Sequence, residues 1–508
     1  MHVVLASSEA VPFCKTGGLA DVCGALPLEL TRLGVQTTLI LPAYSAVKDA
    51  GIALEPTGIT LQIPMASKLV SARILLGHLA VPDAPVGDTI GTDVPVYFID
   101  QPDYFHRPGI YQENGVDYAD NCERFVFFSR AVMEAIRQLS LRVDILHCND
   151  WQTALIPALL KIEYGILPGF ENASSLLTVH NLAYQGTFWH WDMLLTGLDW
   201  KYFNWTQMEY HGKLNLLKTG LVFADAISTV SPTYAREIQT PLAGCGLEGV
   251  LQNRREVLHG ILNGIDTDQW NPATDVLLAK NYDVTTYRAG KAANKLALQK
   301  ELALPQSETT PLIVCVGRLA EQKGLDLILD VLRDWLPSSL HDAQWAFLGT
   351  GDPGIQDQLA KLAERYPTKL AVKFDFSDPL AHRMEAGADM FLMPSRFEPC
   401  GLSHLYSLRY GTVPIVRATG GLVDTITDVN EATLDKETAT GFAFDEYHPM
   451  ALADALKRAL DLYANQSAWQ KLVETGMRQD WSWGRSARDY LDVYAGMQAK
   501  ARKSLVSR

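Results

Sequence analysis

The residues most suited to chemistry gather in one stretch near residue 400. Residues 393–421 read MPSRFEPCGLSHLYSLRYGTVPIVRATGG, and the carboxylate of Glu398 lies in a short polar loop within it. Gly401 follows, and we expect a helix to begin at Leu402. Backbone N–H groups at the start of a helix bind anions, whereas a carboxylate beside them needs another partner, such as sugar hydroxyls. The stretch therefore favours a phosphorylated sugar as ligand; a polar loop that only caps an α/β crossover is the alternative.

A second loop carries two positive charges. The apolar residues 312–316 are typical of a buried strand, and they run into the loop GRLAEQKG at 317–324 and an apolar helix over 325–332. Arg318 and Lys323 would project from this loop and the first helical turn, at the carboxyl end of a strand, where open α/β sheets bind ligands. Two cations beside a helix N-terminus predict a diphosphate site, and surface charges without a ligand are the alternative.

A third loop lies near the N-terminus. Residues 3–6 read as a buried strand, and Lys15-Thr16-Gly17-Gly18 precedes a helix with Asp21 in its first turn. We expect Pro27 to open a second helical segment. Paired glycines let the backbone approach a ligand closely, and Lys15 adds a positive charge.

Apolar segments at regular intervals predict the strands that position these loops. They cover residues 3–6, 37–41, 143–148, 176–179, 226–230 and 257–262 in the first half, and 312–316, 343–348, 370–374, 389–394, 413–416 and 441–444 in the second. Residues 51–100 alternate in short β-like runs and predict an inserted, partly exposed sheet, and residues 121–139 predict a helix. The repeated strand–loop–helix pattern predicts the α/β class with two Rossmann-like domains.

We place the domains at residues 1–261 and 262–480, with the hinge near 261–268. Residues 481–508 would form a C-terminal segment whose helix, expected over 486–497, crosses back to the first domain. A chain of 508 residues is too long for one hydrophobic core, in agreement with this division.

Bulk properties restrict the partners. The net charge of −14 argues against a nucleic-acid surface, so any phosphate site must be a local basic cluster. Seven scattered cysteines favour a reducing compartment. The sequence offers no signal peptide and no apolar run of the roughly 18 residues that a membrane span needs, so we expect a cytoplasmic protein without a membrane partner.

Three further patterns carry less weight. Residues 349–354 fit the dinucleotide fingerprint G-x-G-x-x-G, but Pro353 interrupts it and it lies in the middle of a domain. Asp266-Thr267-Asp268 fits a metal-binding Asp-x-Asp pattern, but no third oxygen ligand is recognisable nearby, so we expect no metal. We interpret the tryptophans as core side chains, with a sugar-stacking surface as the alternative: Trp189, Trp191, Trp200 and Trp205.

Taken together, the motifs resemble those of bacterial glycogen synthases and plant starch synthases. They occur in the same order over essentially the whole chain: SSE at 7–9 with KTGGLADV at 15–22, NDWQT at 149–153, TVHN at 178–181, NGID at 263–266, GRLAEQKG at 317–324, PSRFEPCG at 394–401 and TGG at 419–421. The resemblance implies a type B glycosyltransferase fold, with two Rossmann-like domains facing across a cleft. Residues 1–261 would then be the acceptor-side domain and residues 262–480 the nucleotide-sugar domain. It also implies transfer of glucose from ADP-glucose to the non-reducing-end 4-hydroxyl of an α-1,4-glucan such as glycogen, with retention of configuration and without metal or other cofactor.

The resemblance also implies roles for the residues. Arg318 and Lys323 would hold the diphosphate, and Lys15 would reach the distal phosphate or the acceptor region. Backbone N–H groups would complete the anion site, at Gly18, Gly401 and Leu402. The other predicted roles concern the sugar and the base: Glu398 for the 3- and 4-hydroxyls of glucose, His180 for its 6-hydroxyl or the face where positive charge develops, Asn263 for the donor sugar, Asp21 near the nucleotide, Phe376 for stacking on adenine and Asp150 on the acceptor side.

Several alternatives remain open at this stage. Phe376 stands where relatives commonly have tyrosine, so a UDP-glucose-dependent synthase is possible. A phosphorolytic glucan enzyme of the same fold would need a lysine that carries pyridoxal phosphate. A protein that binds glucan or nucleotide sugar without turnover is the third alternative. The expected bacterial enzyme would bind ADP-glucose, ADP and glycogen.

Overall fold

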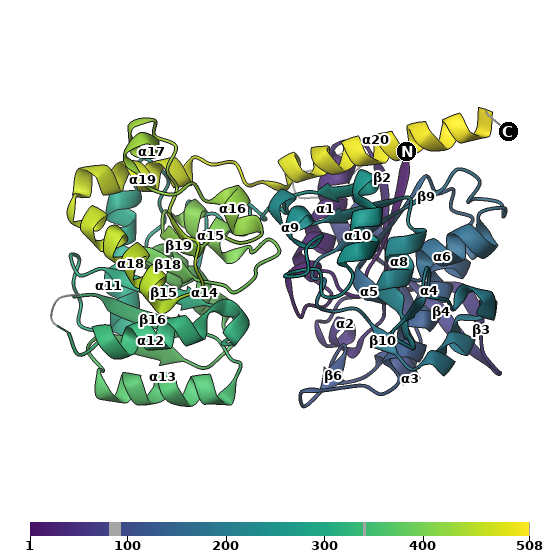
Figure 1. Ribbon diagram of the computed structural model, residues 1–508, viewed down its shortest axis with the longest axis horizontal. Coiled ribbons are helices and arrows are strands. Elements are labelled where there is room, and N and C mark those ends of the chain that lie inside the picture. The colour runs from purple at the N-terminus through teal and green to yellow at the C-terminus, as the bar shows by residue number, and fades with distance from the viewer. Residues whose placement is uncertain (81–92, 339–341, 507–508) are drawn as a thin grey trace. The chain divides into compact units, whose positions relative to one another are not determined.

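The computed structural model describes residues 1–80, 93–338 and 342–506, and it divides into two compact units (Figure 1). Unit 1 comprises Met1–Asn263 and Trp483–Arg508, and unit 2 comprises Gly264–Ser482. Each unit contains a sheet built largely from parallel strands with helices packed against it, which confirms the predicted α/β class.

The sheet of unit 1 has the strand order β14-β13-β9-β8-β1-β2-β5-β4-β3. Its strands are β1 (His2–Ala6), β2 (Gln36–Pro42), β3 (Glu55–Met65), β4 (Lys68–Ala80), β5 (Asp93–Asp100), β8 (Ile145–Asn149), β9 (Ser174–Val179), β13 (Ala226–Thr229) and β14 (Leu258–Gly260). The strands from β14 to β5 are parallel, whereas β4 pairs antiparallel with β5 and with β3. The region predicted as an inserted sheet therefore extends the main sheet at one edge; its residues 81–92 lie outside the described residues.

The longer helices of unit 1 are α1 (Gly18–Arg32), α4 (Asn121–Gln138), α8 (Leu216–Phe223) and α20 (Trp483–Val506). Its shorter elements are α2 (Ser45–Asp49), α3 (Pro102–Phe105), β6 (Gln112–Glu113), β7 (Val116–Asp117), α5 (Asp150–Thr153), α6 (Ile156–Leu159), η1 (Leu160–Tyr164), β10 (Thr187–Phe188), η2 (His190–Asp192), α7 (Met193–Thr196), η3 (Trp200–Tyr202), β11 (Glu209–Tyr210), β12 (Lys213–Asn215), α9 (Pro232–Glu237), α10 (Glu248–Asn253) and η4 (Arg255–Val257). Pro27 does not open a second segment, because it lies buried within the continuous helix α1.

The C-terminal helix α20 packs against the core of unit 1 (Figure 1). Tyr490 and Tyr494 are fully buried, and the Tyr494 hydroxyl is 2.7 Å from Nδ1 of His147 in strand β8. A residue close to the end of the chain is thereby tied to the middle of the N-terminal sheet.

Unit 2 contains a parallel sheet of order β17-β16-β15-β18-β19-β20. The strands are β15 (Leu312–Val316), β16 (Gln344–Leu348), β17 (Leu370–Lys373), β18 (Met390–Met393), β19 (Val413–Arg417) and β20 (Phe442–Phe444). The helices are α11 (Tyr287–Glu301), η5 (Glu321–Lys323), α12 (Leu325–Trp335), α13 (Pro353–Arg365), α14 (Asp378–Gly387), α15 (Ser403–Tyr410), α16 (Gly421–Thr425), α17 (Glu431–Asp435), α18 (Pro449–Ala464) and α19 (Gln466–Met477). The central position of β15 and β18 puts the two predicted ligand loops of this unit beside each other.

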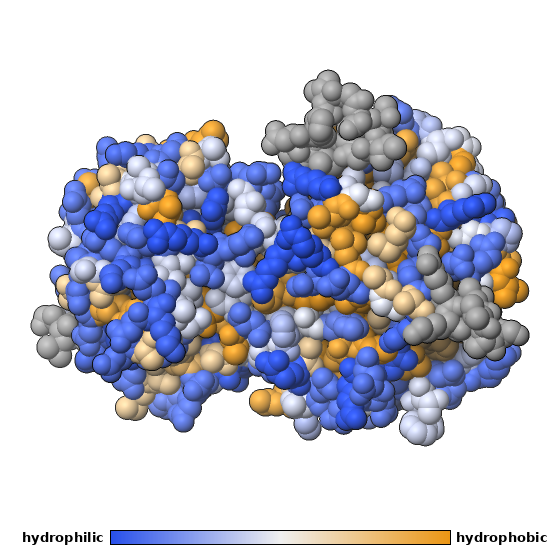
Figure 2. Space-filling model, turned by 90° about the horizontal axis from the view of Figure 1, so that it is seen from above, coloured by the Kyte–Doolittle hydropathy of each residue, from blue (hydrophilic) through white to orange (hydrophobic). Residues whose placement is uncertain are grey.

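The surface seen in Figure 2 is mainly hydrophilic, with apolar side chains gathered in patches. Within the described ranges, no helix combines the length and the apolar character that crossing a bilayer requires. The tryptophans interpreted as core are instead exposed, by 41–78% of their surface: Trp189, Trp191, Trp200 and Trp205.

Candidate functional site

The loop after strand β15 lies against the end of strand β18. Gly324 has a φ of 75°, and a Cβ at this position would lie 2.1 Å from the carbonyl oxygen of Pro394. Lys323 belongs to the 3₁₀ turn η5 that precedes Gly324, and not to the first turn of the following helix as the sequence predicted. This turn directs the lysine toward the loop that carries Glu398.

Lys323 and Glu398 form an ion pair at the centre of this region. Lys323 Nζ donates a hydrogen bond to Glu398 Oε2 at 2.5 Å, and Ser395 Oγ donates to the same oxygen at 3.1 Å. The glutamate side chain is only 7% exposed and the lysine side chain 25%. Because both bonds reach Oε2, the carboxylate is held in one orientation.

Glycines hold the backbone around Glu398. Gly401 has a φ of 76° and Gly420 a φ of 49°, and a Cβ on Gly420 would lie 1.9 Å from the carbonyl oxygen of Glu398. The N–H group of Gly421 donates to the same carbonyl at 3.2 Å. Helix α15 begins two residues after Gly401, with Leu402 as its N-cap. Among the described residues no side chain caps it, so its first N–H groups can bind an anion.

Sequence reasoning missed His404, whose Nδ1 would lie 3.0 Å from a Cβ atom placed on Gly401. The Thr425 hydroxyl donates to the Gly421 carbonyl at 2.7 Å, so its oxygen accepts from Nε2–H of His404 at 2.7 Å. Burial lowers the pKa of His404 to about 3, so the ring is neutral and its Nδ1 is an acceptor. That atom is buried and has no hydrogen-bond partner among the described residues.

Arg318 and Phe376, the other two side chains of unit 2 predicted to bind the sugar nucleotide, are exposed. Arg318 donates from Nη2 to Gln322 Oε1 at 2.6 Å, and Gln322 accepts at its carbonyl oxygen from the backbone N–H of Arg396 at 2.8 Å. Arg318 is thereby linked to the loop of Glu398. Phe376 lies beyond the end of β17 with 82% of its surface exposed, on a different loop.

In unit 1 the loop Lys15-Thr16-Gly17-Gly18 leads into helix α1. Lys15 Nζ donates to Asp21 Oδ1 at 2.7 Å, and both side chains are partly exposed. Gly17 is the N-cap in extended conformation, and no side chain in the described ranges caps the helix, so the N–H groups near Gly18 can bind an anion. The structure thus brings together the three residues predicted here: Lys15, Gly18 and Asp21.

A buried carboxylate that sequence reasoning did not single out shapes this loop. Glu9, only 3% exposed, accepts hydrogen bonds from the backbone N–H and the hydroxyl of Thr16 and, at 2.5 Å, from the hydroxyl of Tyr111. The Tyr111 hydroxyl also lies 2.7 Å from Ser8 Oγ. The pattern SSE contained a signal for Glu9, but nothing near it in the sequence pointed to Tyr111.

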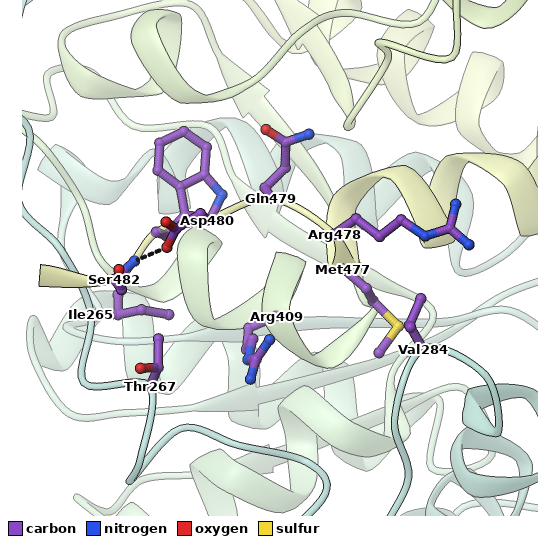
Figure 3. Close-up of a pocket in the computed structure, with 10 residues that line it drawn as sticks. Ile265, Thr267, Val284, Arg409, Met477, Arg478, Gln479, Asp480 and Ser482 are labelled. Carbon is purple, nitrogen blue, oxygen red and sulfur yellow. Dashed lines mark hydrogen bonds between the residues drawn. The ribbon is translucent and has the colours of Figure 1, made fainter. Parts of the chain in front are cut away.

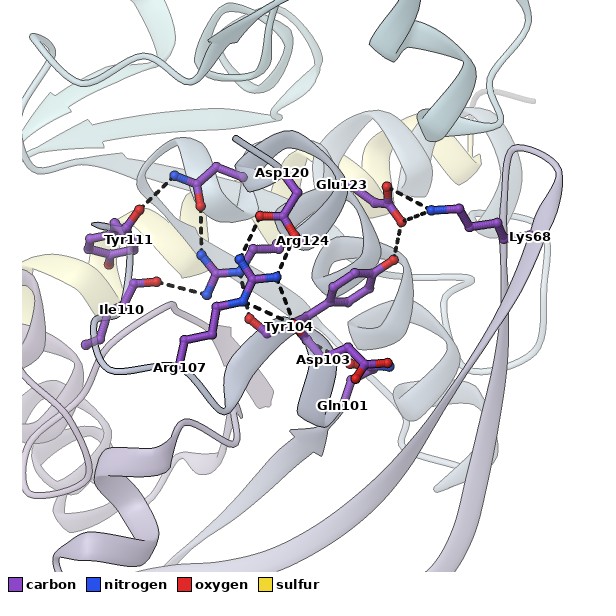
Figure 4. Close-up of polar contacts among 11 residues, drawn as sticks. Lys68, Gln101, Asp103, Tyr104, Arg107, Ile110, Tyr111, Asp120, Glu123 and Arg124 are labelled. Atoms are coloured by element: carbon purple, nitrogen blue, oxygen red, sulfur yellow. Dashed lines mark hydrogen bonds and ion pairs between the residues drawn. The ribbon is translucent and has the colours of Figure 1, made fainter. Parts of the chain in front are cut away.

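The segment that carries Tyr111 is itself braced by an arginine (Figure 4). Arg124 is fully buried, and its guanidinium donates to the carbonyl oxygens of Tyr104 at 2.7 Å and Ile110 at 2.9 Å. Arg107 forms two hydrogen bonds with the carboxylate of Asp120. These bonds fix residues 104–111 on helix α4, and the position of Tyr111 follows from them.

Asp150 and His180 lie together at the carboxyl ends of β8 and β9. Asp150 adopts a φ of 53° and its Oδ1 accepts the backbone N–H of His180 at 2.7 Å. Asn149 donates from Nδ2 to the carbonyl of Ala6, so its Oδ1 accepts from Nε2–H of His180 at 3.0 Å. Desolvation lowers the pKa of His180 to about 3, so the imidazole is neutral and presents Nδ1 as an acceptor.

Burial also raises the pKa of Asp150 to about 7.

Asn263 is the last residue of the first segment of unit 1 and is only 6% exposed. Its Oδ1 is buried without a hydrogen-bond partner in the parts of the chain that the structure describes. An unpaired buried acceptor is costly, and a hydroxyl donated by a ligand would relieve this cost.

Ten of the twelve predicted residues therefore form three local groups: Arg318, Lys323, Glu398, Gly401 and Leu402 in unit 2; Lys15, Gly18 and Asp21 in unit 1; and Asp150 with His180 in unit 1. Asn263 and Phe376 belong to none of these groups. Unit 2 also contains a cavity of about 390 Å³ lined by Arg409, Trp481 and neighbouring residues, and it includes none of the predicted residues (Figure 3).

Comparison with known proteins finds relatives that match both halves of the chain. Residues 2–253 match the family model described as starch synthase catalytic domain, and residues 299–474 match glycosyl transferases group 1. A glycogen synthase of Rhodopirellula baltica is 48% identical, with 97% of both chains covered. A glycogen synthase of Syntrophotalea carbinolica is 44% identical, with 97% of this chain and 98% of the relative covered.

Two solved structures are similar in fold. The catalytic domain of starch synthase IV from Arabidopsis thaliana, bound to ADP and acarbose, has a TM-score of 0.88 and 33% identity and covers 98% of this chain and 99% of its own. Sucrose-phosphate synthase from Thermosynechococcus elongatus, at 16% identity and a TM-score of 0.57, shares the fold over 98% of this chain and 99% of its own. The chain belongs to the glycogen and starch synthase family of glycosyltransferases.

Proposed function

We propose that this protein is a glycogen synthase that transfers glucose from ADP-glucose to the non-reducing-end 4-hydroxyl of an α-1,4-glucan with retention of configuration. The observation that carries the proposal is the ion pair of Lys323 with the buried Glu398 beside an uncapped helix start. A cation, a sugar-binding carboxylate and an anion site within one loop pair are what a sugar diphosphate requires. Relatives named glycogen synthase and the ADP-bound starch synthase structure support the same donor and acceptor.

The chemistry assigned to unit 2, as the nucleotide-sugar domain, is stabilisation of the leaving diphosphate. The donor phosphates attract Lys323 and Arg318, whose charges offset the negative charge that develops as the C–O bond of the glucosyl group breaks. The helix start at Gly401 and Leu402 adds backbone N–H donors. Glu398 then uses both carboxylate oxygens for the 3- and 4-hydroxyls of the glucose, and Phe376 stacks on the adenine.

Unit 1, as the acceptor-side domain, would contribute positioning. Nδ1 of the neutral His180 imidazole accepts a hydrogen bond from the 6-hydroxyl of glucose. Asn263 Oδ1 accepts a hydrogen bond from another hydroxyl of the donor sugar. Lys15 and the N–H groups near Gly18 bind phosphate oxygen, Asp21 lies near the nucleotide, and Asp150 contacts the acceptor side. We propose front-face attack by the acceptor hydroxyl, whose proton passes to the departing phosphate oxygen while the new glycosidic bond forms. Most of the rate enhancement would then come from positioning and electrostatic stabilisation.

The proposal is tested by ADP release from ADP-glucose, measured with and without glycogen and in parallel with UDP-glucose. We expect glycogen-dependent ADP release and an elongated glucan. Faster turnover with UDP-glucose would assign a different donor. Binding of ADP-glucose without ADP release in the presence of glycogen would identify a binding protein and overturn the proposed activity.

A further inference from the structure

Unit 1 exposes an unusual number of tryptophans within one short segment. Trp189 is 62% exposed, Trp191 49%, Trp200 41% and Trp205 78%. Tryptophan is a large apolar side chain that is usually well buried, and contiguous exposed aromatic surface marks a binding site more often than isolated exposed residues do. None of these side chains belongs to the groups around Lys15, Asp150 and His180 described above. The segment nevertheless begins near Asp150, because the ring of Phe188, next to Trp189, contacts that of Trp151, with centroids 5.6 Å apart.

Three of the indoles and one phenyl ring form a continuous row, which we call the aromatic wall: Trp189, Trp191, Trp200 and Phe203. The ring centroids of Trp189 and Trp191 are 6.4 Å apart, those of Trp191 and Trp200 are 5.4 Å apart, and those of Trp200 and Phe203 are 5.2 Å apart. Successive ring planes are inclined by 67°, 41° and 37°. Successive rings are therefore not coplanar, and a flat, rigid ligand could not stack on every ring.

The backbone beneath the aromatic wall is firmly held. Arg130 donates to the carbonyl oxygen of Thr196 and also pairs with Glu163 at 3.1 Å. Met193 is fully buried in the turn between Trp191 and Trp200, and Asp199 caps the 3₁₀ turn that carries Trp200. The rings are thus exposed on a fixed support, which lowers the entropic cost of binding a ligand.

From this geometry we infer that the aromatic wall is a second binding surface for α-1,4-glucan, separate from the residues that hold the donor sugar. Indole faces can stack on the apolar C–H faces of pyranose rings, as aromatic platforms stack on other flat rings. His190 can hydrogen-bond the sugar hydroxyls from within the row, because its ring centroid lies 5.4 Å from that of Trp189 and 5.3 Å from that of Trp191. The pyranose rings of a helical α-glucan are inclined to one another, as the aromatic rings of the row are. The glucan is also uncharged, so a protein of net charge −14 does not repel it.

The inference deepens the proposed function and rests on it, because the glucan is also the proposed acceptor. A surface that holds a long chain would raise the local concentration of its ends at the catalytic residues without changing the chemical step. The aromatic wall would affect turnover with glycogen. It would not affect turnover with an oligosaccharide too short to reach both the wall and the catalytic residues.

The test compares the parent enzyme with the double variant Trp189→Ala/Trp191→Ala. Leu242→Ala serves as the control, because Leu242 is 96% exposed in the same unit. Glycogen binding is measured by affinity electrophoresis, and ADP release is measured with glycogen and with maltotetraose. We expect at least a tenfold loss of glycogen affinity and a matching rise in the half-saturating glycogen concentration, with kcat and KM unchanged for maltotetraose and ADP-glucose. The Trp189→Phe/Trp191→Phe variant should recover most of the binding.

Three outcomes would overturn the inference. Unchanged glycogen affinity would show that the rings do not bind glucan. Equal losses with glycogen and maltotetraose would place the rings in the acceptor subsite itself. A change of oligomeric state in size-exclusion chromatography would identify a protein interface instead. If the parent enzyme releases no ADP with either acceptor, the proposed function fails, but affinity electrophoresis still decides the role of the aromatic wall.

Discussion

The glycine-rich loops of the two units share a strand–loop–helix pattern but use their buried carboxylates differently. In unit 1, Glu9 accepts bonds from Thr16 and Tyr111, while Lys15 pairs with the partly exposed Asp21. In unit 2, the buried Glu398 bonds directly to the lysine of the neighbouring loop. The carboxylate of unit 1 thus shapes the backbone, whereas that of unit 2 holds the cation.

This difference has consequences for ligand binding. An exposed ion pair contributes about 0–1 kcal/mol, so Lys15 can leave Asp21 for a phosphate at little cost. When Lys323 turns to a phosphate, Glu398 loses its cation in a buried setting and needs hydroxyl donors in exchange. The loop of unit 2 is therefore suited to bind phosphate and sugar together, and single substitutions should affect it more strongly.

The largest effect is expected for Glu398→Gln. The amide retains the shape of the side chain and can accept from Ser395, but it loses the charge that pairs with Lys323 and binds the sugar hydroxyls. We expect kcat to fall by about 10²–10³ while the protein remains folded. Steady-state ADP release measures kcat, and thermal unfolding measures whether the variant is folded. Asp357→Asn, at an exposed ion pair, is the control. A kcat within twofold of the parent would remove Glu398 from the site.

A third buried carboxyl, Asp150, separates the effect of burial from that of ion pairing. Its pKa is raised to about 7, chiefly by burial, so its contribution to stability is present below its ordinary pKa and is lost as the pH rises through about 7. We expect Asp150→Asn to gain stability relative to the parent between pH 5 and 8, by on the order of a few kcal/mol. Urea unfolding across this range measures the difference, and a constant offset would contradict the raised pKa.

Alanine substitutions of the two lysines test the comparison directly. Lys323→Ala leaves the buried Glu398 without its cation. It should lower the free energy of unfolding by about 1–3 kcal/mol, the usual cost of a buried polar group that loses its partner. Lys15→Ala breaks the exposed ion pair with Asp21 and should lower the free energy of unfolding by about 0–1 kcal/mol. Urea unfolding without ligand gives both values, and ADP titration should show weaker binding for each variant. Equal stability losses would mean that the two loops do not differ in this respect.

The smallest effect is expected for Tyr111→Phe. The substitution removes one hydrogen bond to Glu9 but leaves both bonds from Thr16, so we expect a loss of about 1 kcal/mol in stability. Activity should fall by only a few-fold, through KM for the donor more than through kcat, because the loop of Lys15 becomes less well held. Tyr184→Phe, at a tyrosine 53% exposed, is the control. An unchanged KM would show that Glu9 needs only Thr16.

Much of the architecture could be predicted from local patterns. Apolar runs bounded by glycine and polar residues located the strands of both units, because a strand buried on both faces must be apolar along its length. The loops around Glu398, Lys323 and Lys15 were predicted for the same reason, since they follow such strands and precede helices. The family was recognisable from seven short motifs in order, and the comparisons confirm it.

Pairing and exposure could not be predicted in this way. That Lys323 bonds Glu398, 75 residues further along the chain, or that Tyr111 reaches Glu9, depends on which strand ends lie side by side. The tryptophans near residue 190 were assigned to the core because their type favours burial, but the turns that carry them face outward. The sequence alone determined which residues stand at strand ends and where the backbone must bend, because these follow from local chemistry. Only the tertiary structure decided which charges meet and which rings contact solvent, because both depend on packing between segments distant in sequence.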